Sequence, residues 1–352
     1  CDHQPVQADL GKAIEVASEL YPDINFKHSN FPEYIKAIKE KVPNDLAVVK
    51  GKLTSQDTDG WSTLMNCASS HIYLKQMNRK CESALENGAE PVRVLSSVLG
   101  QNYPSDELEY SWKKLMQNHP HDSICCCSVD EVQDEMATRF NKSKQVADYL
   151  VSEGKRYIAD KINTKEYEKY KNALPFVVFN TTGRERTSVV SVEIDVTRKS
   201  GWLKKCAYDL DEINVPNYKL IDSDGNSIPF KIEDLGVKFG YDLPKDKFRQ
   251  PYMARRVRVT FEAENISAVG YKTYALVEGD TEKVTDTLVS SENCMENDAI
   301  RVEINKNGSL NVTDKASGRT YKGVAYYEET GDLGNEYMYK MPEGSKAITT
   351  QD

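Results

Sequence analysis

The run of residues 118–131 gathers side chains that bind metals and transfer protons. It reads Asn-His-Pro-His-Asp-Ser-Ile-Cys-Cys-Cys-Ser-Val-Asp-Glu, so His121 and Asp122 are adjacent and three cysteines follow closely. Imidazole nitrogens, carboxylate oxygens and thiolates are the protein ligands of zinc, and imidazole and carboxylate groups also move protons. The run therefore predicts a metal-binding or catalytic site.

A helix is expected to follow this run and to hold it in place. Ser128 and Glu131 form the S-x-x-E pattern of a capping box, which predicts a helix that begins at Val129. A plain helix cap with a solvated loop in front of it would show the same pattern. Spacing alone leaves both interpretations open.

The region around the run is expected to be a helical bundle. Between residues 61 and 171, apolar residues recur at i, i+4 spacing, which predicts the buried faces of helices. Further helices are expected at residues 90–102 and, after Pro104, at 105–118. The predicted core positions are Tyr73, Met77, Cys81, Leu85, Val132, Met136 and Phe140.

The first 55 residues alternate between two kinds of segment. Helix-like stretches are expected at 10–20 and 34–41, and strand-like stretches at 24–27 and 47–53. Such alternation is typical of an α/β domain with a parallel sheet.

After Pro175 the period of the pattern changes to two. Apolar residues alternate with polar ones along 190–196 and again along 257–261, which predicts antiparallel sheet with one solvated face. Asp224-Gly225 predicts a hairpin turn, and a further β-domain is expected from Ala299 onward.

Composition places the chain among ordinary globular proteins of two or three domains. It has 352 residues, of which 39% are hydrophobic. A formal net charge of −9 disfavours a nucleic-acid partner, and the basic cluster at 255–258 is expected on a solvated sheet face. No apolar run approaches the roughly 18 residues of a membrane span, and no signal peptide opens the chain, so no membrane partner and a cytoplasmic location are expected. The eight cysteines are too sparse for a disulfide scaffold and predict reduced thiols.

Several of these segments together resemble one known family. Residues 112–124, followed by Cys-x-Cys-Ser and an Asp-Glu-Val helix, are similar to the zinc-binding segment of bacterial-type α-mannosidases of glycoside hydrolase family 38. Residues 69–79 resemble the first long helix of that family's helical domain, and residues 2–5 the end of its catalytic sheet. Segments between 299 and 337 resemble the opening of its C-terminal β-sandwich.

The resemblance implies a multidomain fold. Residues 1–55 would end an α/β catalytic domain, 56–172 would form the helical bundle, 173–285 a β-domain, and 286–352 the start of a large antiparallel β-sandwich.

The resemblance also implies roles for single residues. A retaining glycosidase generally needs two carboxyl groups about 5 Å apart. Asp2 stands where the family has its acid/base carboxyl, with His3 beside it on the substrate side, although a lone Asp near a chain end is usually only solvated. His121 matches a zinc ligand whose metal engages the hydroxyls at carbons 2 and 3 of mannose.

Four further positions are implied with alternatives. Asp122 matches a carboxylate that contacts sugar hydroxyls, and orienting an imidazole is the competing role. His119 is expected to be structural rather than a second zinc ligand, because Pro120 stiffens the backbone between the two histidines. Asp332 and Tyr337 are candidates for substrate binding, because they lie in a segment similar to a loop that reaches the active site; a plain loop is equally compatible with the residues.

The other half of such a site is missing from these residues. The family takes its remaining zinc ligands from a His-x-Asp pair and from the nucleophilic Asp, and no His-x-Asp occurs among the five histidines. We therefore expect a fragment of a longer polypeptide that is inactive alone. Exposed strand edges would favour self-association into a homo-oligomer.

Three positions depart from the family's usual pattern. Cys126 replaces a glycine, which predicts a backbone that is strained by a side chain. Gln133 stands where bacterial relatives commonly carry His, and His71 where they carry Arg. The three adjacent cysteines are expected to be buried as small hydrophobic residues.

The residues and the resemblance together predict a zinc-dependent, retaining α-mannosidase. Its substrate would be a terminal α-mannoside, in a small mannosyl glycoside or an oligosaccharide. The alternative is a non-catalytic carbohydrate-binding or scaffold protein with the same architecture, which the departures at Cys126 and the missing ligands would explain.

Overall fold

The computed structural model describes residues 5, 7–43, 45–48, 50, 65–244, 246–280 and 287–350. The chain divides into two compact units, Cys1–Ser55 and Gln56–Asp352.

The first unit contains two helices in its described part. Helix α1 spans Leu10–Leu20 and α2 spans Phe31–Lys39, where Asn30 caps the helix by accepting a hydrogen bond from the Glu33 amide at 3.0 Å. Both predicted helices are therefore present, and α2 starts earlier than expected because of this cap.

The strand predicted at 24–27 is wrong. Those residues form a bend and irregular backbone, and no strand of the described part of the unit lies beside them. An extended segment needs a neighbouring strand for its backbone hydrogen bonds. Residues 47 and 48 are also irregular, and most of the predicted strand at 47–53 lies outside the described residues. The α/β arrangement of residues 1–55 stays a prediction.

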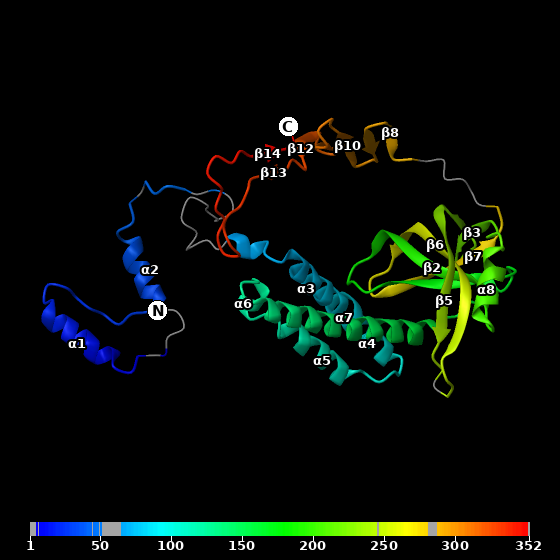
Figure 1. The fold of residues 1–352 in the computed structure, drawn as a ribbon, viewed down its shortest axis with the longest axis horizontal. Helices are drawn as coiled ribbons and strands as arrows, with labels where there is room; N and C mark the ends of the chain where they lie inside the picture. Colours follow the sequence, from blue (N-terminus) through cyan, green and yellow to red (C-terminus); the bar gives the residue numbers. More distant parts are fainter. Residues whose placement is uncertain are drawn as a thin grey trace. The chain divides into compact units, whose positions relative to one another are not determined.

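The second unit begins with a helical part that ends in one long helix. A 3-10 turn at Met65–Ala68 precedes α3 (Ile72–Ala84), and a π-helical turn (Leu85–Ala89) leads into α4 (Glu90–Val98). Helix α5 (Ser105–Met116) and the short α6 (His121–Ile124) follow. Helix α7 (Asp130–Ala159) lies along α3, α4 and α5 (Figure 1).

The core of this bundle contains most of the predicted positions. Cys81, Leu85, Met136 and Phe140 are buried, whereas Tyr73 is 48% exposed. The prediction that Tyr73 is buried is wrong, because each i, i+4 step advances about 40° beyond a full turn. Tyr73 therefore lies about 120° around the helix from Leu85. Leu74, about 20° from Leu85 by the same geometry, is fully buried instead.

The capping box predicted before α7 is not formed. The helix begins at Asp130, its N-cap residue is Val129, and no side chain caps it. The Ser128 hydroxyl is buried and has no hydrogen-bond partner among the described residues. The Ser128 carbonyl accepts a hydrogen bond from Gln133 Nε2 at 2.8 Å, which holds Ser128 in the preceding turn.

The β-domain consists of two antiparallel sheets with the core between them. After a 3-10 turn (Lys165–Tyr167), one sheet has the order β1-β7-β3-β4 and the other β2-β6-β5, with α8 beside them (Figure 1). Their bounds are β1 Leu174–Asn180, β2 Arg186–Lys199, α8 Leu203–Asp211, β3 Tyr218–Asp222, β4 Ser227–Ile228, β5 Phe230–Asp242, β6 Gln250–Ile266 and β7 Gly270–Glu278.

The predicted alternation of β2 is confirmed. Val190, Val192, Ile194 and Val196 pack against the core that contains Val257 and Val259 of β6. The Asp224-Gly225 hairpin is also present between β3 and β4, with Gly225 at a φ of 87°.

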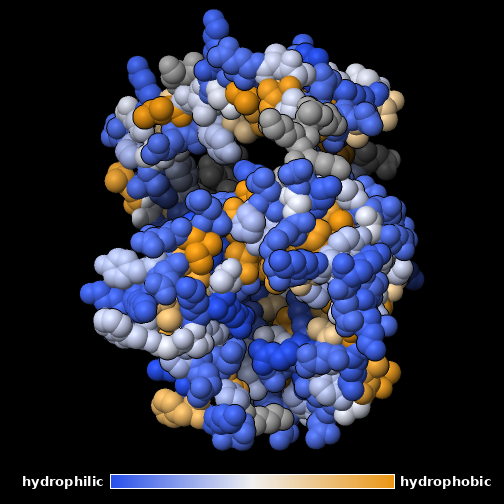
Figure 2. All heavy atoms as spheres, turned by 90° about the vertical axis from the view of Figure 1, so that its right-hand side faces the viewer, coloured by the Kyte–Doolittle hydropathy of each residue, from blue (hydrophilic) through white to orange (hydrophobic). Residues whose placement is uncertain are grey.

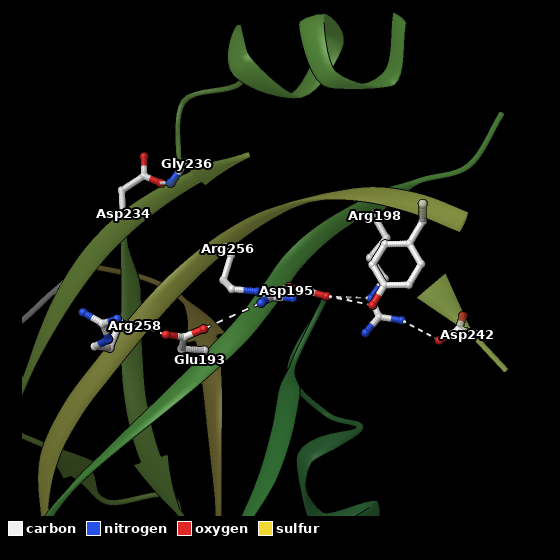
Figure 3. A network of polar contacts seen from close by, with 9 residues as sticks. Glu193, Asp195, Arg198, Asp234, Gly236, Asp242, Arg256 and Arg258 are labelled. Atoms are coloured by element: carbon white, nitrogen blue, oxygen red, sulfur yellow. Dashed lines mark hydrogen bonds and ion pairs between the residues drawn. The ribbon is translucent and has the colours of Figure 1, made fainter. Parts of the chain in front are cut away.

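The opposite face of β2, β5 and β6 is a ladder of ion pairs (Figure 3). Asp195, whose side chain is 7% exposed, accepts hydrogen bonds from Arg256 Nε at 2.7 Å and Arg198 Nε at 3.1 Å. Arg258 lies between Glu193 at 3.0 Å and Glu233 at 2.9 Å. The basic cluster thus lies on an outer sheet face, as predicted, and its charges are paired.

The remaining strands form a separate antiparallel sheet in the order β12-β11-β10-β9-β8, and a two-stranded ladder, β13-β14. Their bounds are β8 Val289–Ser291, β9 Cys294–Glu296, β10 Ile300–Ile304, β11 Leu310–Asp314, β12 Arg319–Val324, β13 Glu328–Glu329 and β14 Ile348–Thr349.

The face shown in Figure 2 is mainly hydrophilic, with apolar side chains in scattered groups. This agrees with the mean hydropathy of −0.62. Among the described residues, the helices are either too short or too polar to cross a bilayer.

The ion-pair ladder allows a stability test. Asp195→Asn keeps the side-chain shape but removes the charge from the most buried acceptor, so we expect the free energy of unfolding to fall by about 1–3 kcal/mol. The matched control Glu233→Gln removes a carboxylate that is 54% exposed, and should cost about 0–1 kcal/mol. Urea denaturation of both variants measures the difference, and equal losses would show that burial of Asp195 is unimportant.

Candidate active-site turn

His121, predicted to bind zinc, and Asp122, predicted to contact the substrate, lie on a single helical turn. Pro120 starts α6, and its carbonyl accepts hydrogen bonds from the amides of Ser123 at 2.9 Å and Ile124 at 3.1 Å. The side chains of His121 and Asp122 are 75% and 69% exposed, and His121 Nε2 lies 3.6 Å from Asp122 Oδ1. The backbone of the turn is thus fixed, while the imidazole and the carboxylate face outward together.

The neighbouring histidine has a structural contact. His119 Nε2 lies 2.7 Å from Asn78 Oδ1 of α3. Asn118 is buried, and its side-chain Nδ2 donates a hydrogen bond to the Met136 carbonyl of α7 at 3.1 Å. These two contacts connect the end of α5 to α3 and α7, immediately before the turn.

Cys126 has the strained backbone that was expected from its replacement of glycine. Its φ is 63°, in the left-handed region, which costs roughly 1–2 kcal/mol for a residue with a Cβ. The side chain is 1% exposed and belongs to the bundle core. Burial of this thiol offsets part of the strain.

Donors from α3, from the turn just before it and from α7 hold the carbonyl groups around Cys126. Ser70 Oγ and Gln133 Nε2 both donate to the Cys126 carbonyl, each at 3.2 Å. Lys75 Nζ donates to the carbonyl of Ser70 at 2.6 Å and to that of Cys125 at 3.5 Å. We call Ser70, Lys75 and Gln133 the anchor residues.

His71 contributes to this hydrogen-bond network indirectly, through its contact with Ser70. Its Nδ1 lies 3.1 Å from Ser70 Oγ, and its own φ is 45°, again left-handed. His71 and Gln133 therefore lie on the same hydrogen-bond network as Cys126.

The loop at residues 331–340 is organised by Asp332. Its Oδ1 accepts hydrogen bonds from the amides of Gly334 at 2.7 Å and Lys340 at 2.9 Å, and its Oδ2 from Asn66 Nδ2 at 3.0 Å. The backbone hydrogen bond from Lys340 is the main cause that holds the pKa of Asp332 below its usual value. The structure therefore places Asp332 in the loop's own framework.

Tyr337 comes from this loop to the turn. Its carbonyl accepts a hydrogen bond from the Asn66 amide at 3.4 Å, and its hydroxyl is hydrogen-bonded to the Cys127 thiol. Contact with Cys127, then burial, and then the charge of Asp122 raise the pKa of Tyr337 to about 12. The structure thus brings Tyr337 beside Asp122, whereas Asp2 and His3 lie outside the described residues.

The three adjacent cysteines do not all behave as predicted. Cys126 is buried, as expected, but Cys125 and Cys127 are half-buried and their Sγ atoms meet at 3.1 Å. Cys125 and Cys127 are two residues apart rather than adjacent, and the chain turns between them at the left-handed Cys126, where their thiols meet. Burial raises the pKa of Cys127 to about 11.

Comparisons with protein families match two parts of the chain. The model of the α-mannosidase middle domain matches residues 62–158, and that of the family 38 glycosyl hydrolase C-terminal domain 1 matches residues 171–278. The chain belongs to glycoside hydrolase family 38.

Individual relatives of this family 38 chain are bacterial. A putative mannosylglycerate hydrolase of Halalkalibacterium halodurans is 43% identical over the whole chain. An α-mannosidase from Enterococcus faecalis V583, known from a crystal structure, has 44% sequence identity and a TM-score of 0.80, and the match covers the whole chain. A second family 38 protein from Enterococcus faecalis has 38% sequence identity and a TM-score of 0.77, and the match covers 98% of the chain. The chain spans 40% of the length of each of these relatives.

The hydrogen bonds of Asp332 predict a pH dependence. Because the folded-state pKa of this carboxyl is lowered, its stabilising contribution is present above the unfolded value of about 4 and is lost as the pH falls through the folded value. Asp332→Asn should therefore destabilise the chain at neutral pH, and the difference from wild type should shrink in acid. The midpoints of urea denaturation, measured at neutral pH and in acid, test this. Asp298→Asn, at an exposed position, is the control. A difference in midpoint between Asp332→Asn and wild type that stays constant with pH would contradict the prediction.

Proposed function

We propose that the polypeptide containing this chain is a zinc-dependent, retaining α-mannosidase that hydrolyses terminal α-mannosides, and that the turn at 120–127 forms part of its active site. Family membership and the names of the relatives support the reaction class. The observation that carries the assignment of the site is the outward-facing pair His121 and Asp122, 3.6 Å apart on a turn whose backbone is anchored.

The chemistry of the turn fits a share in a catalytic zinc site. Neutral imidazole is a common zinc ligand, and a carboxylate beside it would orient the ring through a hydrogen bond. His121 would hold the metal, and the further ligands and the nucleophile would come from residues outside this sequence, which lacks a His-x-Asp pair. When bound, zinc would supply positive charge that anchors the mannosyl hydroxyls.

The other residues would bind the substrate or transfer protons. The Asp122 carboxylate would accept a hydrogen bond from a sugar hydroxyl, and Tyr337 beside it would contact the same sugar. Asp332 would fix the loop that carries Tyr337. Asp2 would protonate the leaving oxygen and then deprotonate water, as a retaining mechanism requires, with His3 beside it.

The substrate is proposed to be a mannosyl glycoside of small size or an oligosaccharide. The first relative's name includes mannosylglycerate, which is a small mannosyl glycoside. A cytoplasmic location and a homo-oligomeric state stay predictions.

The direct test uses the complete polypeptide encoded by the reading frame that contains these residues. We expect the wild type to contain zinc and to hydrolyse an aryl α-mannoside, and His121→Ala to lose bound zinc and more activity than the roughly 10–100-fold lost when only an outer partner of a ligand is changed. Elemental analysis and initial rates measure the two effects. His119→Ala, which removes a contact to Asn78, is the matched control and should retain zinc.

The outcome separates the two candidate functions. A wild-type protein without zinc and without turnover would contradict the enzyme and favour the non-catalytic carbohydrate-binding or scaffold protein. Loss of zinc in His119→Ala but not in His121→Ala would show that the ligand is assigned to the wrong histidine.

A further inference from the structure

The turn contains a second group of potential metal ligands, which shares only Asp122 with the proposed mannosidase site. The Sγ atoms of Cys125 and Cys127 and a carboxylate oxygen of Asp122 all lie within 4.8 Å of one another. The two sulfur atoms are 3.1 Å apart, and Cys127 Sγ is 3.4 Å from Asp122 Oδ1. Three donors from one short segment thus converge on one point.

We propose that Asp122, Cys125 and Cys127 form a thiolate-rich site for a soft divalent cation, with zinc as the physiological candidate. This goes beyond the proposed function, since it needs neither His121 nor any residue outside the described chain.

The distances suit tetrahedral coordination. With zinc–sulfur bonds of about 2.3 Å and zinc–oxygen bonds of about 2.0 Å, two sulfur ligands are about 3.8 Å apart and a sulfur and an oxygen about 3.5 Å apart. The sulfur–oxygen distance already has this value within a few tenths of an ångström. The two thiols need to separate by only about 0.7 Å, which side-chain rotation provides.

The backbone that presents these ligands is already fixed. The left-handed φ of Cys126 turns Cys125 and Cys127 to one side, and the anchor residues hold the carbonyl groups of Cys125 and Cys126. A preformed ligand set lowers the conformational entropy that binding has to overcome. The strained backbone of Cys126 therefore also positions the two thiols of the proposed metal site.

The charges and protons of the binding step balance. Both thiols lose their protons to solvent as the cation binds, so two thiolates, one carboxylate and the divalent cation together carry a net charge of −1. Lys75 Nζ, 3.5 Å from Cys126 Sγ, adds a compensating positive charge nearby. The Cys127 thiol contacts Asp122 through Oδ1 at 3.4 Å, which leaves Oδ2 for the sugar contact proposed above.

The donor set selects the class of cation. Thiolate ligands favour zinc and other soft ions over magnesium and calcium, which prefer oxygen ligands. Cobalt(II) replaces zinc in such sites and reports thiolate ligands by an intense charge-transfer absorption in the near-ultraviolet, which imidazole and carboxylate ligands do not produce.

The experiment titrates the reduced chain with cobalt(II) and follows this absorption. We expect saturation at one equivalent, loss of the absorption when zinc is added, and its absence in Cys125→Ser and Cys127→Ser. Cys206→Ser, which changes a buried thiol in α8, and His121→Ala should both keep it. Circular dichroism confirms that each variant is folded.

Two results would overturn the site. One is a wild-type titration without charge-transfer absorption, and the other is an absorption that persists in the double variant Cys125→Ser/Cys127→Ser. If the serine variants do not fold, alkylation of the wild type replaces them: zinc should protect Cys125 and Cys127 from iodoacetamide, and equal labelling with and without zinc contradicts the proposal. Both readouts are independent of hydrolysis, so failure of the mannosidase function would not affect them.

Discussion

The arrangement of the candidate site depends on one backbone constraint, the left-handed conformation of Cys126. A residue with a Cβ adopts this conformation only where the surroundings compensate for the strain. Here the compensation comes from Ser70, Lys75 and Gln133, which donate hydrogen bonds to carbonyl groups in or next to the turn, and from burial of the thiol. As a result, one turn carries His121 and Asp122 outward and directs two thiols toward each other.

Periodicity predicts the fold where burial on one face decides it. The alternation of β2 and the apolar stripe of α7 are both found, because each element packs against a single core. The same logic fails at Tyr73, where four-residue spacing drifts around the helix, and at residues 24–27, where an apolar pattern has no neighbouring strand in the described chain. Both failures concern geometry that a local pattern does not contain.

The site itself was predictable only in part. The adjacency of His121 and Asp122 is visible in the sequence, and the glycine replacement at Cys126 indicates its strain. The approach of Tyr337 follows from resemblance to a family and not from spacing, since a distant loop carries it. The anchor residues donate to backbone carbonyl groups, which have no sequence signature, and the meeting of Cys125 and Cys127 requires the left-handed residue between them.

The central claim is that the turn is preformed by its anchors, and amide hydrogen exchange measures this most directly. The amides of Ser123, Ile124, Cys125 and Cys126 all donate to carbonyl groups of the turn. We predict that they exchange slowly, at rates similar to those of α7, and that Gln133→Leu accelerates them while Gln117→Leu, at an exposed position, does not. Fast exchange in the wild type, or no effect of Gln133→Leu, would contradict the account.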